Sequence, residues 1–302
     1  MSEKKKITDK LLLEELRKRF EEKEAAINGL QEMTDELKGV NSKLQASEQL
    51  KSNFIANINN EIVNPFASVL GLSRNILDVK ENDWDKVKYM AKLIFVEAHN
   101  LDFQLKNIFA AAQIEAGQVY PQLSLVDVSS LIQGVLEDFE NDLASKRLNP
   151  VFISKAEESG KSIRFKLDPE KLKLIFSNLI SNAIKFSKGA DIKIVVKKVN
   201  KSLVVSVTDY GIGISDKNKE IIFDRFTRLD TGINSVNRGH GLGLSVVKAY
   251  IDLFDGDINI ESKMGAGSTF TVTLPEPKSN EEIEGFSAEG NEVFFGDDDG
   301  IF

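Results

Sequence analysis

The chain has 302 residues, of which 41% are hydrophobic and 28% are charged. This composition is typical of a soluble folded protein and excludes a largely disordered one. No apolar stretch reaches the roughly 18 to 20 residues that a membrane-spanning helix needs, and no apolar segment follows the basic N-terminus as it would in a signal peptide. Without cysteine the chain can form neither disulfides nor a thiolate site. We expect a cytoplasmic protein.

The net charge of −8 is concentrated at the C-terminal end. Residues 276–302 contain nine acidic residues and one lysine, so they carry the whole excess of negative charge. Nucleic-acid binding depends on clustered Lys and Arg, and we therefore expect no nucleic-acid partner. The segment predicts a disordered acidic tail. A docking peptide is the alternative, because the tail also contains Phe286, Phe294, Phe295 and Phe302.

Residues 1–48 predict a long amphipathic helix. A seam of positions spaced three and four apart runs from residue 13 to residue 44, and seven of its ten residues are apolar. This is the pattern of a coiled coil, and Asn41 on the seam is of the kind that fixes a two-stranded register. A single helix packed on its own domain is the alternative. The seam changes phase after Leu44, and we expect the helix to continue into the next segment.

Residues 49–120 predict two long helices connected by a turn at 79–83. The second helix is expected from Trp84 to Ala116, with Gly117 ending it. Two antiparallel helices that continue a coiled coil form half of a four-helix bundle. A homodimer would then be needed to bury both faces of the hairpin.

Residues 121–275 show a mixed pattern of helices and strands. Strands are expected at 163–168, 191–198, 202–208, 257–262 and 268–274, and helices at 129–146, 169–186 and 243–254. Leu203, Val205 and Val207 alternate with other residues, which predicts one buried strand face. The expected fold class is α+β: a coiled coil and dimeric four-helix bundle, then an α/β two-layer sandwich.

Four polar and glycine-rich segments contain the candidate binding residues; they read NLISNAIKFS (178–187), DYGIGI (209–214), GHGLGL (239–244) and GAGSTF (265–270). In the first, Asn178, Asn182 and Lys185 share one face of a helix. An amide oxygen can complete the shell of a phosphate-bound Mg²⁺, and a lysine can neutralise phosphate charge. An ordinary solvated helix face could carry the same residues.

The glycine segments add further binding groups. Asp209 ends a strand, and its carboxylate could accept a hydrogen bond from an adenine amino group. Gly239, Gly241 and Gly243 precede a helix, whose positive end could bind phosphates. GAGSTF predicts a tight turn into the last strand, where Thr269 offers a hydroxyl group. Neither a Rossmann GxGxxG unit nor a Walker P-loop is present.

In this order the segments resemble the ATP-binding domain of two-component sensor histidine kinases, the Bergerat fold shared with gyrase-type ATPases. The resemblance covers about residues 50–275 and implies ATP and Mg²⁺ as ligands. It implies that Asn182 ligates Mg²⁺, Asn178 supports the metal, and Lys185 contacts phosphate. Further nucleotide contacts are implied for Phe186 and Asp209 at adenine, Gly211 and Gly213 at the base pocket, Gly239, Gly241 and Gly243 at the phosphates, and Phe223, Phe226 and Arg228 in the lid. Tyr210 departs from the asparagine frequent in the family.

A fifth segment, KSNFIANINNEIVNP (51–65), resembles the phosphoacceptor helix of the same family, with Asn60 at the position of the acceptor histidine. The matching positions are Phe54, Ala56, Glu61 and Pro65. The amide nitrogen of asparagine is conjugated with its carbonyl and is not nucleophilic, so we expect no autophosphorylation at this position. Natural divergence and an engineered substitution would both account for Asn60.

Glu61 and Asn64 form an E-x-x-N pattern that resembles the family's phosphatase motif. A residue at the Asn64 position would orient water towards the aspartyl phosphate of a response regulator receiver domain. The alternative is that Asn64 caps a bend at Pro65. Two histidines remain: His240 is expected to be a solvated loop residue, and His99 would replace the acceptor only if it met the terminal phosphate.

The sequence therefore predicts a histidine-kinase-family signalling protein that binds Mg-ATP and works with a response regulator without autophosphorylating. Within this prediction the chain could be a trapped kinase, a regulator phosphatase or a nucleotide-sensing pseudokinase. A non-catalytic coiled-coil scaffold is the alternative from another class.

Overall fold

A single long helix opens the chain. In the computed structural model, which describes residues 2–80, 83–155, 162–227 and 241–277, α1 (Ser2–Leu77) is continuous and contains Pro65 in its interior. The chain divides into two units, residues 1–56 and residues 57–302. In the first unit the apolar seam of α1, including Phe20, Leu30 and Leu37, is exposed. The acidic tail from residue 278 onward lies outside the described residues.

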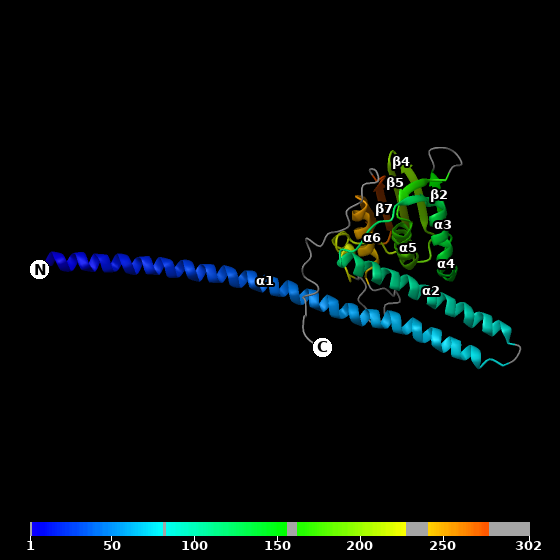
Figure 1. Cartoon of the computed structure of the whole chain (residues 1–302), viewed down its shortest axis with the longest axis horizontal. Coiled ribbons are helices and arrows are strands. Elements are labelled where there is room, and N and C mark those ends of the chain that lie inside the picture. The colour runs from blue at the N-terminus through cyan, green and yellow to red at the C-terminus, as the bar shows by residue number, and fades with distance from the viewer. Residues whose placement is uncertain (1, 81–82, 156–161, 228–240, 278–302) are drawn as a thin grey trace. The chain divides into compact units, whose positions relative to one another are not determined.

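The second unit begins with the last turns of α1, which are followed by a turn and by α2 (Trp84–Glu115). Figure 1 shows that the chain reverses direction between these two helices. Gly117 adopts a positive φ of 62° just after α2, as expected for a glycine that ends a helix. Large apolar side chains remain exposed on both helices, namely Val63, Phe66 and Leu70 on α1 and Tyr89, Phe95 and Phe109 on α2.

A five-stranded sheet follows, with the strand order β2-β4-β5-β7-β6. Its strands are β2 (Val151–Lys155), β4 (Lys193–Val199), β5 (Ser202–Asp209), β6 (Asp257–Lys263) and β7 (Gly267–Pro275). The pair β2–β4 is parallel and the other neighbours are antiparallel. A separate two-stranded antiparallel sheet pairs β1 (Ser124–Asp127) with β3 (Arg164–Leu167).

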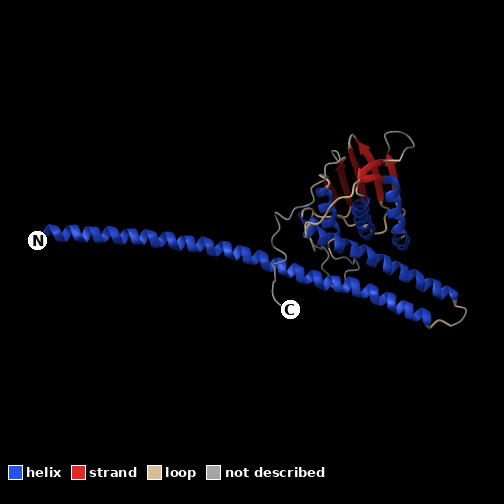
Figure 2. Ribbon diagram, viewed as in Figure 1, coloured by secondary structure: helices blue, strands red, loops and turns tan. Residues whose placement is uncertain are grey.

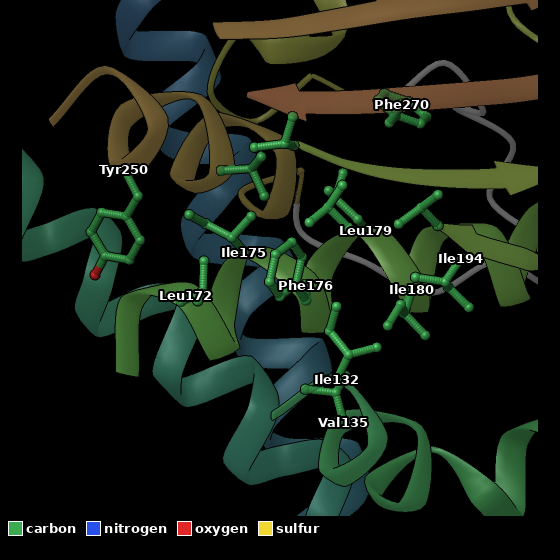
Figure 3. Packing of buried hydrophobic residues seen from close by; sticks show 14 of the residues in the cluster. Ile132, Val135, Leu172, Ile175, Phe176, Leu179, Ile180, Ile194, Tyr250 and Phe270 are labelled. Atoms are coloured by element: carbon green, nitrogen blue, oxygen red, sulfur yellow. The ribbon is translucent and has the colours of Figure 1, made fainter. Parts of the chain in front are cut away.

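Helices cover one face of this sheet (Figure 2). They are α3 (Val128–Asp138), α4 (Glu140–Lys146), α5 (Pro169–Phe186) and α6 (Gly243–Leu253). Along β5, Leu203, Val205 and Val207 are buried as their alternation predicted. Figure 3 shows the buried side chains that join the layers, among them Ile132, Val135, Leu172, Ile175, Phe176, Leu179, Ile180, Ile194 and Phe270. The observed architecture is a helix layer packed on a sheet, in agreement with the predicted α/β sandwich.

Two details differ from the sequence prediction. The helix expected at 129–146 is divided at Phe139, which is buried against Phe103 of α2 with ring centroids 5.6 Å apart. The strands β1 and β2 were not predicted, because they are short and lack a clean alternation of buried and exposed residues.

Among the helices of the described ranges, none combines the length and apolar character that a membrane crossing requires.

Candidate functional site

The helix α5 is anchored at its start by Asp168. The Asp168 carboxylate accepts hydrogen bonds from the backbone N–H groups of Glu170 (3.0 Å) and Lys171 (3.1 Å), which makes it the N-cap. It also accepts from the Gln122 N–H at 2.8 Å and forms an ion pair with the Lys171 ammonium at 2.7 Å. Burial would raise the pKa of Asp168, but the hydrogen bonds from Gln122 and Lys171 outweigh it and hold this pKa below its usual range. The start of α5 is therefore firmly fixed.

Asn178 lies in the middle of α5 and is almost completely buried, with 4% of its surface exposed. Its side-chain nitrogen donates to the Leu174 carbonyl at 2.9 Å and to the side-chain oxygen of Asn107 at 2.7 Å. Asn107 belongs to α2 and was not singled out from the sequence. The predicted metal-supporting residue is therefore connected to the helical hairpin.

Asn182, Lys185 and Phe186 follow on α5 and are half-buried. The last turn of α5 carries Lys185 and Phe186, and it is hydrogen bonded to α4. The Lys146 ammonium donates to the carbonyls of Ile184 (2.9 Å) and Lys185 (3.0 Å). Residues Lys146, Lys185 and Phe186 line a cleft of about 400 Å³ that Ile212 also borders. The structure thus joins the end of α5 to the segment after β5.

Asp142 of α4 adds a negative charge near this end of α5. Burial raises the pKa of the Asp142 carboxyl, and electrostatic interactions with His99, Lys185 and Lys146 oppose that rise. Lys185, the predicted phosphate contact, therefore has an acidic neighbour that the sequence did not indicate.

Asp209 lies at the end of β5 and is 5% exposed. Its carboxylate accepts a hydrogen bond from the Gly211 N–H at 2.9 Å. Burial raises the pKa of Asp209, although hydrogen bonds from Gly211 and Ser268 act in the opposite direction. A Cβ atom at Gly211 would collide with the backbone carbonyl of Phe186. Only glycine therefore lets this segment pass so close to the end of α5.

The next glycine of the same segment is equally constrained. Gly213 has a φ of 70°, and a side chain there would collide with the Lys263 carbonyl. The Ile212 carbonyl accepts a hydrogen bond from Gly265 N–H at 2.7 Å, which fixes the segment to the turn before β7. The DYGIGI and GAGSTF segments, far apart in the sequence, are thus adjacent.

Thr269 is not brought to Asp209. In the pairing of β5 with β7, Thr269 lies opposite Thr208, and their hydroxyl oxygens are 3.0 Å apart. Ser268 lies opposite Asp209, is buried, and hydrogen bonds to its carboxylate. Because alternate residues of a strand face opposite sides of a sheet, the hydroxyl that accompanies Asp209 comes from Ser268.

The predicted lid is described only at its two ends. Phe223 ends a short 3-10 helix, η2 (Ile221–Phe223), and packs on the core. The Phe226 N–H donates to the Gly241 carbonyl at 3.0 Å, so the two ends of the lid meet. Gly241 has a φ of 73° and leaves no space for a side chain against the backbone of Phe226 and Thr227. The predicted residues Arg228, Gly239 and His240 lie outside the described residues.

Gly243 begins α6, an 11-residue helix whose N-terminus presents backbone N–H groups. A Cβ atom at Gly243 would lie 2.5 Å from the side-chain oxygen of Asn178. The structure therefore brings the start of α6 against the predicted metal-supporting amide.

The acceptor-like segment lies on α1. The side chains of Asn60 and Glu61 lie outside the described part of the structure, whereas Asn64 is exposed. The helix α1 continues through Pro65 without ending. His99 of α2 packs edge-on against Phe139, with ring centroids 6.2 Å apart.

The sequence of this chain is similar to those of known ATPase domains and histidine kinases. Residues 167–278 match the family described as histidine kinase-, DNA gyrase B- and HSP90-like ATPase. The circadian input-output histidine kinase CikA of Synechococcus elongatus is 31% identical over 261 residues, which is 85% of this chain and 34% of CikA. The sensor-like histidine kinase SenX3 of Mycolicibacterium smegmatis is 30% identical over 230 residues, 76% of this chain and 58% of SenX3.

The fold is also similar to that of full-length ShkA, solved in complex with AMPPNP. The TM-score is 0.52 at 23% identity, with 76% of this chain and 45% of that chain covered. The chain spans less than two thirds of the length of CikA and SenX3. The matched ATPase domain, together with histidine kinase relatives that extend over most of this chain, supports its recognition as a two-component sensor histidine kinase.

Proposed function

We propose that the chain binds ATP with Mg²⁺ between α5, the end of β5 and the start of α6, and that it transmits a signal to a response regulator. The observation that carries this proposal is the environment of Asp209. The carboxylate is buried beside glycine backbone, and its pKa is raised by that burial. Burial of this kind disfavours the ionised carboxylate, and a hydrogen bond donated by the amino group of a bound adenine would offset that cost.

The phosphate side of the proposed site fits a magnesium ion. Within the described part of the chain, no donor reaches the buried side-chain oxygen of Asn178, which lies beside Gly243. A buried acceptor without a donor is suited to a metal ion or to its bound water. Asn182, one turn further along α5, would be the direct ligand. Asn182 and Asn178 would hold the Mg²⁺, which would supply positive charge against the phosphates, and Lys185 would contact a phosphate.

We propose further that position 60 accepts no phosphoryl group. The test incubates the chain and its Asn60→His variant with Mg²⁺ and ATP labelled on the γ-phosphate. Because histidine supplies the nucleophilic nitrogen that asparagine lacks, we expect acid-labile label on the variant alone. This result would leave the acceptor as the single missing part of a working kinase.

The other outcomes separate the alternatives. Acid-labile label on the unaltered chain would contradict the proposal and direct attention to His99 and His240. If neither protein is labelled although ATP binds, the chain is a nucleotide-sensing pseudokinase. If calorimetry shows no binding of ATP at millimolar concentration, the chain is a scaffold and the proposed function is wrong.

Phosphatase activity towards the regulator is the second candidate. The observation that favours it is that Asn64 is exposed on a helix that continues through Pro65, where the capping alternative expects a bend. An exposed amide can orient a water molecule for attack on an aspartyl phosphate. A receiver domain phosphorylated with acetyl phosphate should then lose its phosphate faster with this chain than with its Asn64→Ala variant. Equal rates would exclude the role of Asn64.

We propose a homodimer as the active assembly, with 1–48 as a signalling coiled coil, 49–120 as the dimerisation hairpin, 121–275 as the ATP-binding domain and 276–302 as a tail. The support is the row of exposed apolar side chains on α1 and α2, including Phe66, Leu70 and Phe95. Exposed apolar surface of this extent is typical of an interface. Light scattering should give about twice the chain mass of 33.6 kDa. A stable monomer would contradict both the coiled coil and the bundle.

A further inference from the structure

Asn107 is a buried amide on a helix outside the ATP-binding domain. It is 1% exposed and lies on the side of α2 where Ala110 is also buried. A buried amide must be hydrogen bonded, because its groups have lost their contact with water. The partners of Asn107 show what this side chain does.

Hydrogen bonds to backbone carbonyls fix the orientation of both amides. The side-chain nitrogen of Asn107 donates to the Phe103 carbonyl at 3.0 Å, and that of Asn178 donates to the Leu174 carbonyl at 2.9 Å. Of the two polar atoms of an amide, only the nitrogen can donate to a carbonyl, so these two bonds identify the nitrogen of each side chain. The 2.7 Å contact between the two side chains is therefore a hydrogen bond from Asn178 nitrogen to Asn107 oxygen.

This hydrogen bond determines which polar group of the Asn178 side chain remains available to a ligand. Both N–H bonds of its amide are used, and its oxygen faces the start of α6, where a Cβ atom at Gly243 would lie 2.5 Å away. Rotating the amide by half a turn would set its oxygen against the Leu174 carbonyl and the Asn107 oxygen. One acceptor would then face two acceptors, so the Asn107 oxygen helps to exclude this orientation.

We infer that Asn107 is a positioning residue for the nucleotide–metal site: it holds the side-chain oxygen of Asn178 towards the start of α6. This inference rests on the proposed function and assigns α2 a part in the metal site. A second contact of α2 supports it, because Glu115 forms an ion pair with Arg225 of the lid segment at 3.6 Å. The helix α2 thus contacts two segments of the proposed nucleotide site.

The test measures nucleotide affinity by calorimetry, with Mg²⁺ and with EDTA, for the full chain and its Asn107→Leu variant. Leucine has a similar volume but offers no acceptor, which releases the Asn178 amide. We expect the affinity gained from Mg²⁺ to fall about tenfold, the effect of one buried hydrogen bond, while affinity in EDTA changes less than about twofold. In an Asn178→Ala background, Asn107→Leu should cause no further loss of the Mg²⁺ effect.

Three controls complete the experiment. Gln113→Leu removes an exposed amide from the same helix and should leave the Mg²⁺ effect unchanged. Asn107→Asp keeps an acceptor for Asn178, and its protonated carboxyl group can still donate to the Phe103 carbonyl, so this variant should retain the Mg²⁺ effect. Because leucine at a buried position can prevent folding, Asn107→Ala is measured as well, with the same expected loss.

The outcomes separate this inference from the function on which it rests. If the unaltered chain binds no nucleotide with Mg²⁺, the proposed function is wrong and the inference fails with it. If that chain binds and neither Asn107→Leu nor Asn107→Ala changes the Mg²⁺ effect, only the inference is overturned. Equal losses with Mg²⁺ and with EDTA would also overturn it, because they would assign Asn107 a purely structural role.

Discussion

Replacing Asp168 by alanine should strongly destabilise the ATP-binding domain. This carboxylate is the N-cap of α5 and also binds the Gln122 N–H and the Lys171 ammonium. The Lys171 ammonium in turn donates to the Tyr120 carbonyl at 3.1 Å. Asp168 therefore connects the segment that follows α2 to the helix that carries the site amides, and alanine removes every contact of its carboxylate together.

The size of the effect follows from the separate losses. A missing N-cap costs about 0.5–2 kcal/mol, and the Gln122 N–H left without its partner costs about 1–3 kcal/mol. Removing one member of a buried ion pair costs about 3–5 kcal/mol. The three losses overlap, and the Lys171 side chain, 15% exposed, can still reach water in part. We therefore expect Asp168→Ala to lower the free energy of unfolding by about 3–4 kcal/mol.

Urea unfolding of the full chain and of Asp168→Ala, followed by circular dichroism, measures this difference. The pKa of Asp168 is held below its ordinary value of 3.8, so its stabilisation is fully present above that value and is lost as the pH falls through the folded-state pKa. The difference between the two proteins should be the same at pH 7 and pH 5 and should shrink below pH 3.8. A loss under about 1 kcal/mol at pH 7 would refute the reasoning, because one cap alone accounts for that much.

Two further predictions concern the base pocket. Because burial raises the pKa of Asp209 above 3.8, its stabilising contribution is complete below that value and is lost as the pH rises through the folded-state pKa. The unfolding free energy of the unaltered chain, measured in urea relative to Asp209→Asn, should increase from pH 7 towards pH 4; a decrease would contradict the assigned burial effect. Gly211→Ala places a methyl group against the Phe186 carbonyl and should cost at least about 1–3 kcal/mol, whereas Gly134→Ala, which meets no atom within 4 Å in α3, should stabilise by about 0.5–1 kcal/mol. Equal melting temperatures of the two variants would contradict the close contact.

Local signals were sufficient to predict the helix and strands that carry most of the site. The bounds of α5 agree with the prediction of 169–186, because an Asp-Pro start and a helical apolar period both lie within the segment. The strand β5 was predicted at 202–208 and ends one residue later. In contrast, Phe139, where the predicted helix is divided, packs against Phe103 of α2, which is distant in sequence. Such tertiary contacts leave no mark in the local pattern.

The residues of the candidate site also divide into those that the sequence identified and those that it did not. The sequence identified Asn178 and Asp209 from short motifs, but it could not identify Asn107, since one amide among the polar residues of α2 has no distinguishing neighbour. Ser268 was within reach of sequence reasoning. It alternates in phase with the buried Phe270 on β7, which places it on the core side of the sheet, whereas Thr269 lies on the other side. The strand period, applied to this segment, would have selected Ser268.

Two features of the domain favour an ATP-binding protein over an inert scaffold. Burial disfavours the ionised form of the Asp209 carboxyl, and within the described residues the Asn178 oxygen has no donor. A ligand that donates to Asp209 and binds the Asn178 oxygen would stabilise both groups. Both lie at the proposed nucleotide site, and local conflicts of this kind are typical of functional sites. A ligand that relieves both must stabilise the fold by binding it, so Mg-ATP should raise the unfolding temperature of this chain more than ATP in EDTA does.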